Sequence, residues 1–364
     1  MYGNDGAAST AAGGIQLKKE ARISMEKERL FISEKKITVE YEFLNETDRD
    51  VSTEVAFPIP PYDYAGIFNG GDYPRPVEHF RVWAEGREVA YQSEVKAMLR
   101  GVDYSARLRQ LGIDVASLGH FDNASGDEPF ARDFRKLSKQ QQRELRRVGL
   151  FDEYFPQWTV VMTHHWQQVF PAHKILHVRH EYSPVIGGEN TVLNDLINKK
   201  AEKRHLVTFA QWCINPSLQK TLEVSIRKAD SSSVEWVDYT LTTANTWKKP
   251  IKQFELIVER PKPDTLAKYY YVSFCWDGQI LQTDPDHFVA RATNFVPKRG
   301  LHSILSERVN FEPRILPITA PEETFSFEAP PPRCIFTPVS RSGRAKFRNG
   351  GRMSAIMAPL GFVW

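Results

Sequence analysis

The sequence predicts a mainly β protein, an antiparallel β-sandwich of the immunoglobulin-like or Greek-key type with helical insertions. About ten segments alternate apolar and polar residues with a period of two, which is typical of half-buried strands. These segments follow one another as hairpins and do not alternate with helices, so they indicate antiparallel sheets and not a βαβ fold. The chain has 364 residues and is 41% hydrophobic, which is enough to bury a large core.

Two predicted hairpins lie in the first hundred residues. In the first, at 35–60, the alternation runs on both sides of a polar turn. Its second strand is expected to end at Pro58, because proline cannot donate to the hydrogen-bond ladder. The second hairpin, at 79–94, turns at Glu85 and Gly86, a pair suited to a tight turn.

A loop rich in glycine, proline and tyrosine separates these hairpins. Such loops often carry binding residues. We take Tyr62, Tyr64, Phe68 and Tyr73 as candidate contacts to a ligand or partner. A plain surface connection is the favoured alternative for this loop.

The next segment, 95–155, predicts a helical insertion into the β-domain. Helical patterns occupy 104–114 and 137–155. Within the second, Ser138 and Gln141 have the spacing of a capping box, which marks a helix N-terminus.

The strand pattern then returns. Seven strands and one helix, near 190–206, are predicted in this part of the chain. The strands are expected at 158–170, 174–182, 220–229, 234–243, 252–260, 269–276 and 286–295.

These patterns divide the chain into five segments. Residues 1–14 are expected to be flexible, and 311–364 form a proline- and arginine-rich tail that is expected to be poorly ordered. The segments are 1–14, the sandwich strands at 15–94, the helical insertion at 95–155, the remaining strands at 156–310, which complete the β-domain or form a second one, and the tail at 311–364.

Five of the ten histidines lie between His164 and His180. If Phe170 pairs with Lys174 across a short turn, His164 faces His180 directly, with Cβ atoms about 5 Å apart. The two are weak candidates for a zinc site, which needs a third protein ligand that no spacing supplies. Core and surface histidines are the favoured interpretation, so no metal or other cofactor is predicted.

Motifs of the common catalytic sites are absent. The sequence has no HExxH, GxSxG, GxGxxG or P-loop pattern, so it carries none of these signatures of hydrolase and nucleotide-binding sites. With 48 basic and 45 acidic residues, there is no global field for nucleic acid. No apolar run is long enough to span a membrane.

Cys213 and Cys275 both lie in apolar contexts, and Cys334 in the proline-rich tail. The residues alone leave two possibilities for the first pair, buried free thiols or a disulfide. The start of the chain, MYGNDGAASTAAGG, has no basic start and no apolar core of a signal peptide.

Several motifs follow one another in a characteristic order along the chain. They are the opening through "SMEKERLFIS" to "VAFP", then "LRGVDYSARLRQLGI", "HHWQQVFPAHKILHVRHEYSPVIGG", "FAQWCIN", "DYTLTTANTWKKPIKQFELIVE" and "VSFCWDG". Together they resemble a bacterial family of unknown function, domain-of-unknown-function family 4424. The resemblance covers roughly residues 10–310, and its specificity comes from the order of the motifs.

Members of this family look like exported proteins of Gram-negative bacteria. The resemblance therefore implies a periplasmic or secreted location, although no leader is visible in this chain, and favours a disulfide between Cys213 and Cys275. It supplies no catalytic residue.

Three functions are compatible with these observations. The first is a non-enzymatic extracytoplasmic binding or structural module, with an unknown protein or a cell-envelope ligand as its partner. The second is a metal-dependent hydrolase that uses the histidine cluster at 164–180. A third, a cytosolic regulator, rests only on the missing leader. The first is favoured, because the chain carries no catalytic signature.

Overall fold

The structure is a computed structural model, and it describes residues 4–11, 14–64, 78–118, 129–184, 186–189, 212–214, 216–227, 231–262 and 271–310. The predictions for Phe68, Tyr73, Cys334, the helix near 190–206 and the tail at 311–364 lie outside the described residues.

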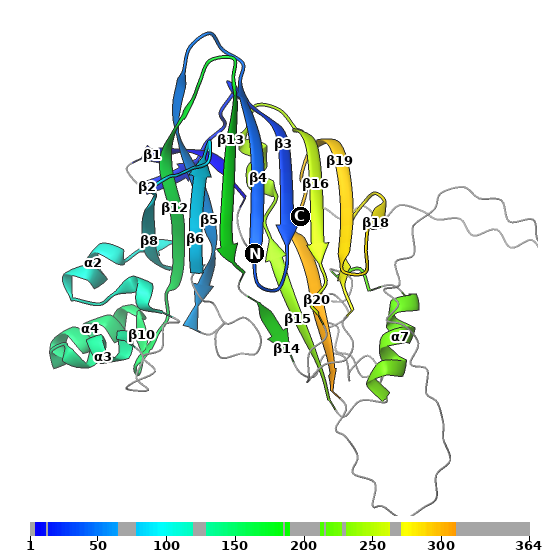
Figure 1. Ribbon diagram of the computed structural model, residues 1–364. Coiled ribbons are helices and arrows are strands. Elements are labelled where there is room, and N and C mark those ends of the chain that lie inside the picture. The colour runs from blue at the N-terminus through cyan, green and yellow to red at the C-terminus, as the bar shows by residue number, and fades with distance from the viewer. Residues whose placement is uncertain are drawn as a thin grey trace, which may run out of the picture.

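The largest element is a sheet of eight strands, which forms the broad layer across the centre of Figure 1. Adjacent strands within this sheet run antiparallel, except that β16 and β3 run parallel to each other. The strands in spatial order are β18 (Ile280–Gln282), β19 (His287–Phe295), β16 (Ile251–Glu259), β3 (Ile23–Ile32), β4 (Ile37–Asn45), β13 (Ile175–Ser183), β6 (Glu78–Ala84) and β7 (Arg87–Glu88).

Two smaller sheets contribute to the same core, and a separate two-stranded sheet lies among the helices. The six-stranded sheet has the order β2 (Gly14–Leu17), β1 (Gly6–Ala11), β5 (Val51–Asp63), β12 (Thr159–Phe170), β8 (Gln92–Leu99) and β9 (Val102–Asp103). The four-stranded sheet has the order β14 (Gly187–Glu189), β15 (Ser231–Tyr239), β20 (Leu301–Asn310) and β17 (Ser273–Phe274).

A single hydrophobic cluster joins the three sheets, so the prediction of a mainly β sandwich with helical insertions is confirmed. Alternate residues of each long strand point into it, because side chains of a strand alternate between faces. Phe43 of the eight-stranded sheet packs 5.7 Å from Phe170 of the six-stranded sheet and 4.7 Å from Trp247, measured between ring centroids.

The helices gather mostly at one end of the six-stranded sheet (Figure 1). They are α2 (Ser105–Gln110), the 3-10 turn η1 (Val115–Ser117), α3 (Pro129–Lys136) and α4 (Lys139–Val148), followed by a short hairpin of β10 (Phe151–Asp152) and β11 (Phe155–Pro156). The remaining helical elements are α7 (Pro216–Arg227) and the 3-10 turn η2 (Thr242–Thr246). In the described part of the chain, no helix combines the length and apolarity needed to cross a bilayer.

Helix α4 begins with the capping box that the sequence indicates. The Gln141 amide donates to Ser138 Oγ at 3.2 Å, and the Ser138 amide donates to Gln141 Oε1 at 2.9 Å. Gly149 ends the helix at φ 85°, a left-handed conformation that glycine adopts without steric cost.

The pairing of β12 with β13 that would place His164 opposite His180 does not form. The two strands lie in different sheets, β12 between β5 and β8 and β13 between β4 and β6. The chain crosses from one sheet to the other at 171–174, where Asn45 Nδ2 donates to the Phe170 carbonyl at 2.8 Å and the His173 amide donates to the Asn45 carbonyl at 3.0 Å. Strand alternation identifies the buried face of a strand but not its neighbour, so it cannot distinguish a hairpin from such an arch.

Two other predictions differ from the structure. Residues 4–11 are not flexible, because β1 pairs with both β2 and β5 and Asn4 and Asp5 are fully buried. The strand predicted at 220–229 falls largely in helix α7. Strand β20 (Leu301–Asn310) was not predicted as a strand.

Residues Asn4 and Asp5 enter the space where the sheets meet. Asn4 Nδ2 donates to Glu28 Oε1 at 2.9 Å, and Tyr41 Oη donates to Asn4 Oδ1. Asp5 Oδ2 lies 3.1 Å from His180 Nε2, and both side chains are fully buried. We call Asn4, Asp5, Glu28, Tyr41 and His180 the buried polar junction.

Burial changes the proton affinity of the two carboxyls in this junction. It raises the pKa of Glu28 to about 8, although the hydrogen bond from Asn4 acts in the opposite direction. Burial also raises the pKa of Asp5, against the opposing effect of His180. Glu28 is therefore held in its protonated form at neutral pH.

This pKa predicts a pH dependence of stability. The unfolded Glu28 loses its proton near pH 4.5 and the folded one near pH 8, so the folded state binds more protons between these values. The free energy of unfolding should then fall as pH rises through this window, by up to about 1.4 kcal/mol per pH unit. Glu28→Gln keeps the oxygen that accepts from Asn4 and should flatten the slope in urea denaturation measured from pH 5 to pH 9.

The matched control is Glu40→Gln, which removes a half-exposed carboxylate from the neighbouring strand β4. It should leave the slope unchanged. An equal slope in the wild type and Glu28→Gln would contradict the burial argument.

Candidate ligand-binding pocket

The structure places His164 and His180 on inner faces of two different sheets. The ring of Phe80 lies near both, 4.8 Å from His164 and 5.4 Å from His180 between centroids. His164 Nδ1 lies within hydrogen-bonding distance of Ser93 Oγ, at 2.8 Å. Burial lowers the pKa of His164 to about 4, so this imidazole is neutral at pH 7.

The other three histidines of the cluster each contact a carboxylate. His165 Nδ1 lies 2.6 Å from Glu54, His173 Nε2 lies 2.8 Å from Asp48, and His177 Nδ1 lies 3.2 Å from Glu85. No group of three or more His, Cys, Asp and Glu side chains among the described residues could hold a metal ion. Three of the five histidines are thus engaged by carboxylates, and His164 and His180 lie in the core.

Two residues of the candidate tyrosine-rich loop support the helices. Tyr62 lies at the end of β5 and is buried, and Tyr64 packs 5.6 Å from Phe130 and 4.9 Å from Phe155 between centroids. Both belong to the second hydrophobic cluster, beneath α2, α3 and α4. Their contacts within the described residues are to the protein's own core.

A disulfide joins Cys213 to Cys275, the pairing that the family resemblance favoured. Next to it, Trp212 is buried, and Ser273 Oγ donates to the Trp212 carbonyl at 2.7 Å. The bond therefore ties the 212–214 segment to the end of strand β17.

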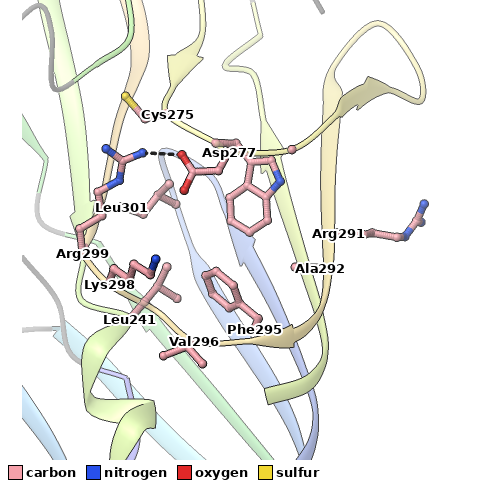
Figure 2. Close-up of a pocket in the computed structure, with 13 residues that line it drawn as sticks. Leu241, Cys275, Asp277, Arg291, Ala292, Phe295, Val296, Lys298, Arg299 and Leu301 are labelled. Atoms are coloured by element: carbon pink, nitrogen blue, oxygen red, sulfur yellow. Dashed lines mark hydrogen bonds and ion pairs between the residues drawn. The ribbon is translucent and has the colours of Figure 1, made fainter. Parts of the chain in front are cut away.

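A pocket of about 350 Å³ opens beside Cys275. It lies between two connections that cross from one sheet to another, 275–279 from β17 to β18 and 296–300 from β19 to β20. Figure 2 shows the side chains that surround it. They are Leu241, Cys275, Trp276, Asp277, Gly278, Arg291, Ala292, Phe295, Val296, Lys298, Arg299, Gly300 and Leu301.

One wall of the pocket is aromatic. Trp276 stacks on the buried Phe254 with a centroid distance of 5.6 Å and an interplanar angle of 19°, and it lies 5.4 Å from Phe295. Phe295 is itself 4.7 Å from Phe254. These contacts hold the indole of Trp276 in place, because each ring is packed by the other two.

Gly278 lies close against the indole. A Cβ atom on Gly278 would lie 3.0 Å from Trp276 Nε1 and 3.4 Å from its Cδ1. A side chain there would press on the indole ring, so glycine lets the turn close over it.

Cationic side chains line the rim. Arg299 pairs with the exposed Asp277 at 3.0 Å and so links the two connections (Figure 2). Arg291 pairs with Glu255 at 2.7 Å; burial opposes ionisation of Glu255, but hydrogen bonds from Arg291 and Arg29 lower its pKa. Lys298 forms no ion pair with a described residue, and its side chain points toward the same space as Phe295 (Figure 2).

The fold and the pocket together define a mainly β sandwich protein with a ligand-sized cavity between two of its sheets. The chain belongs to the family described as "Domain of unknown function (DUF4424)", whose model matches residues 3–305. No curated protein matches the sequence.

Among solved structures, the chain is similar to a "putative nutrient binding protein" from Legionella pneumophila subsp. pneumophila str. Philadelphia 1. The identity is 14%, the match covers 78% of this chain and 68% of the other, and the TM-score is 0.39. A likeness of this size carries no argument about function.

The pocket was not predicted from the sequence. Its walls come from two short stretches, "CWDG" and "FVPKRG", neither of which has a binding motif. Of the predicted site residues that the structure describes, Cys275 lines the pocket. The sequence signal that could have indicated this pocket is a tryptophan directly after a cysteine and before an Asp-Gly pair.

The disulfide closes a sequence separation of 62 residues. Its removal should lower the free energy of unfolding by about 2–4 kcal/mol, because the unfolded chain regains entropy. The double variant Cys213→Ser, Cys275→Ser tests this in urea denaturation, with Cys334→Ser as the control. Equal stability of the double variant and the wild type would contradict a structural role for the bond.

Proposed function

We propose that this protein is a non-enzymatic extracytoplasmic binding module, and that its pocket takes a small organic anion with a flat apolar body. The observation that carries the proposal is the combination of an aromatic wall, Trp276 and Phe295, with the cationic Lys298 at the same cavity. Flat rings stack on aromatic side chains. An anionic group on the ligand would lie toward the ammonium.

The dimensions of the cavity support this class of ligand. A volume of about 350 Å³ lies at the lower end of the range for small-molecule sites, roughly 300–1,000 Å³. The buried Leu241 and Leu301 add further apolar surface. Such a site favours compact ligands over polymers.

The disulfide supports the extracytoplasmic part of the proposal. Bonds of this kind persist in oxidising compartments and are rare in the cytosol. The Cys213–Cys275 bond and the exported character that the family resemblance implies agree on this point. A cytosolic regulator would be expected to keep both thiols reduced.

A metal-dependent hydrolase has less support. His164 is neutral and lies beside Ser93, and His180 is fully buried beside Asp5. Neither imidazole lines the pocket described above. Their positions therefore favour a structural role in the interior of the sandwich over a catalytic one.

Indole-3-acetate and its uncharged amide are a matched pair of probes for the pocket. We expect indole-3-acetate to bind in calorimetric titrations. Trp276→Ala should weaken that binding about twofold to tenfold, since an aromatic pair contributes roughly 0.5–1.5 kcal/mol. Trp83→Ala, on the outer face of the eight-stranded sheet, is the control and should change nothing. Binding that survives Trp276→Ala unchanged would place the ligand elsewhere.

The charge preference is a separate prediction. Lys298→Gln should weaken the acetate about threefold and leave the amide unaffected, because an exposed ion pair contributes at most about 1 kcal/mol. High salt should reduce the difference between the two probes. If the amide binds as tightly as the acetate to the wild type, the ligand need not be an anion.

A further inference from the structure

Helices α3 and α4 concentrate positive charge on one part of the molecule. Residues 129–148 carry seven Lys and Arg side chains against two carboxylates, whereas the whole chain is almost balanced, with 48 basic and 45 acidic residues. The helices lie together at one side of the molecule in Figure 1, far from strands β18 and β19. The charge is therefore local, and the small net charge of the chain conceals it.

The cations of α4 lie on the face that points away from the protein. Gln142 and Leu145 are buried against the core. Lys139, Arg143 and Arg147, spaced four residues apart, lie on the opposite side of the helix, and all three are exposed. We call these three residues the basic ridge.

No described residue neutralises the basic ridge. The nearby acid Glu144 pairs with Arg107 at 3.0 Å, and Asp133 pairs with Lys136 at 3.0 Å. The ridge residues have no hydrogen bond, ion pair or ring contact with any described residue. Like charges four residues apart destabilise a helix slightly, whereas Arg147 in the last turn favours it through the helix dipole.

Other arginines of the same helices are engaged in packing, which sets the ridge apart. The guanidinium of Arg146 lies 5.2 Å from the ring centre of Phe134 and 5.9 Å from that of Tyr154. Arg135 lies 5.7 Å from Tyr154. These cations stabilise the β10–β11 hairpin, whereas the ridge faces solvent.

We propose that the basic ridge docks this protein on an anionic phospholipid surface. Headgroup phosphates accept paired hydrogen bonds from guanidinium groups, and clusters of cations bind anionic bilayers. Tyr154 and Phe155 are 47% and 44% exposed beside α4, and aromatic side chains of this kind favour the membrane interface. This inference is independent of the proposed pocket. It rests on the proposed function in one respect: the extracytoplasmic location favours a lipid surface over nucleic acid.

This orientation leaves the pocket accessible. The helices and the β10 strand lie at one side of the molecule in Figure 1, and strands β18 and β19, which flank the pocket, lie at the other. A molecule docked through α4 would thus present its pocket away from the bilayer. Ligand and membrane could then be bound at the same time.

The test is sedimentation of the full chain with phosphatidylcholine vesicles that contain 30% phosphatidylglycerol, and with pure phosphatidylcholine vesicles. We expect binding only to the anionic vesicles, and loss of it in 0.5 M NaCl. The triple variant Lys139→Gln, Arg143→Gln, Arg147→Gln should bind about a hundredfold more weakly, since each cation near an anionic surface contributes roughly fivefold.

The matched control removes the same charge elsewhere. Lys35→Gln, Arg87→Gln, Lys174→Gln takes three exposed cations from turns and strand β7 outside the helices. It should weaken binding by less than fivefold. Circular dichroism and thermal denaturation of both triple variants show whether they are folded.

Three results would overturn the proposal. They are no binding of the wild type to anionic vesicles, an equal loss in both triple variants, and tighter, ridge-dependent binding to a short DNA duplex than to vesicles. The last would assign the ridge to nucleic acid. Binding of indole-3-acetate to the ridge variant reports on the pocket separately, so failure of one proposal is distinguishable from failure of the other.

Discussion

The three sheets meet at a group of fully buried polar side chains, and the rest of the fold is arranged around it. Asn4, Asp5, Glu28 and His180 come from the N-terminal segment, β3 and β13, and none is exposed. Buried polar groups are costly unless they find partners. The pairing of Asn4 with Glu28 and of Asp5 with His180 therefore requires that the N-terminal segment and the two strands be in place together. A protein of this kind has little tolerance for a displaced first strand, because buried polar groups would lose their partners.

The candidate pocket depends on the same arrangement of sheets. Its two walls are connections that leave one sheet and enter another, and its floor is the aromatic group around Phe254. The disulfide holds one of these connections at Cys275. The cavity thus exists because the sheets are joined by short crossings, and its shape follows from where those crossings are anchored. The cationic side chains discussed above lie at the pocket rim and on α4, where they are exposed to solvent.

Sequence reasoning predicted the faces of strands well and their neighbours poorly. Alternation identified β4, β5, β12 and β13, because each has one face in the core, and the capping box located the start of α4. The partner of β12 could not be predicted, since alternation is the same whichever strand lies beside it. Strand β1 escaped notice because Gly6–Ala11 consists of small residues that carry little hydrophobic signal. Helix α7 resembled a strand because "TLEVSIR" alternates and contains β-branched residues, and the pocket combines residues that only folding brings together.

The parallel pairing of β3 with β16 has a consequence for how the chain is made. Contacts across this pair, such as Arg29 with Glu255, join residues 226 positions apart. During synthesis, which proceeds from the N-terminus, one edge of β3 therefore stays unpaired until most of the chain has been made. An unpaired edge recruits other strands and promotes aggregation, and contacts of such separation form slowly. The nascent chain is accordingly most exposed to aggregation before β16 has been synthesised.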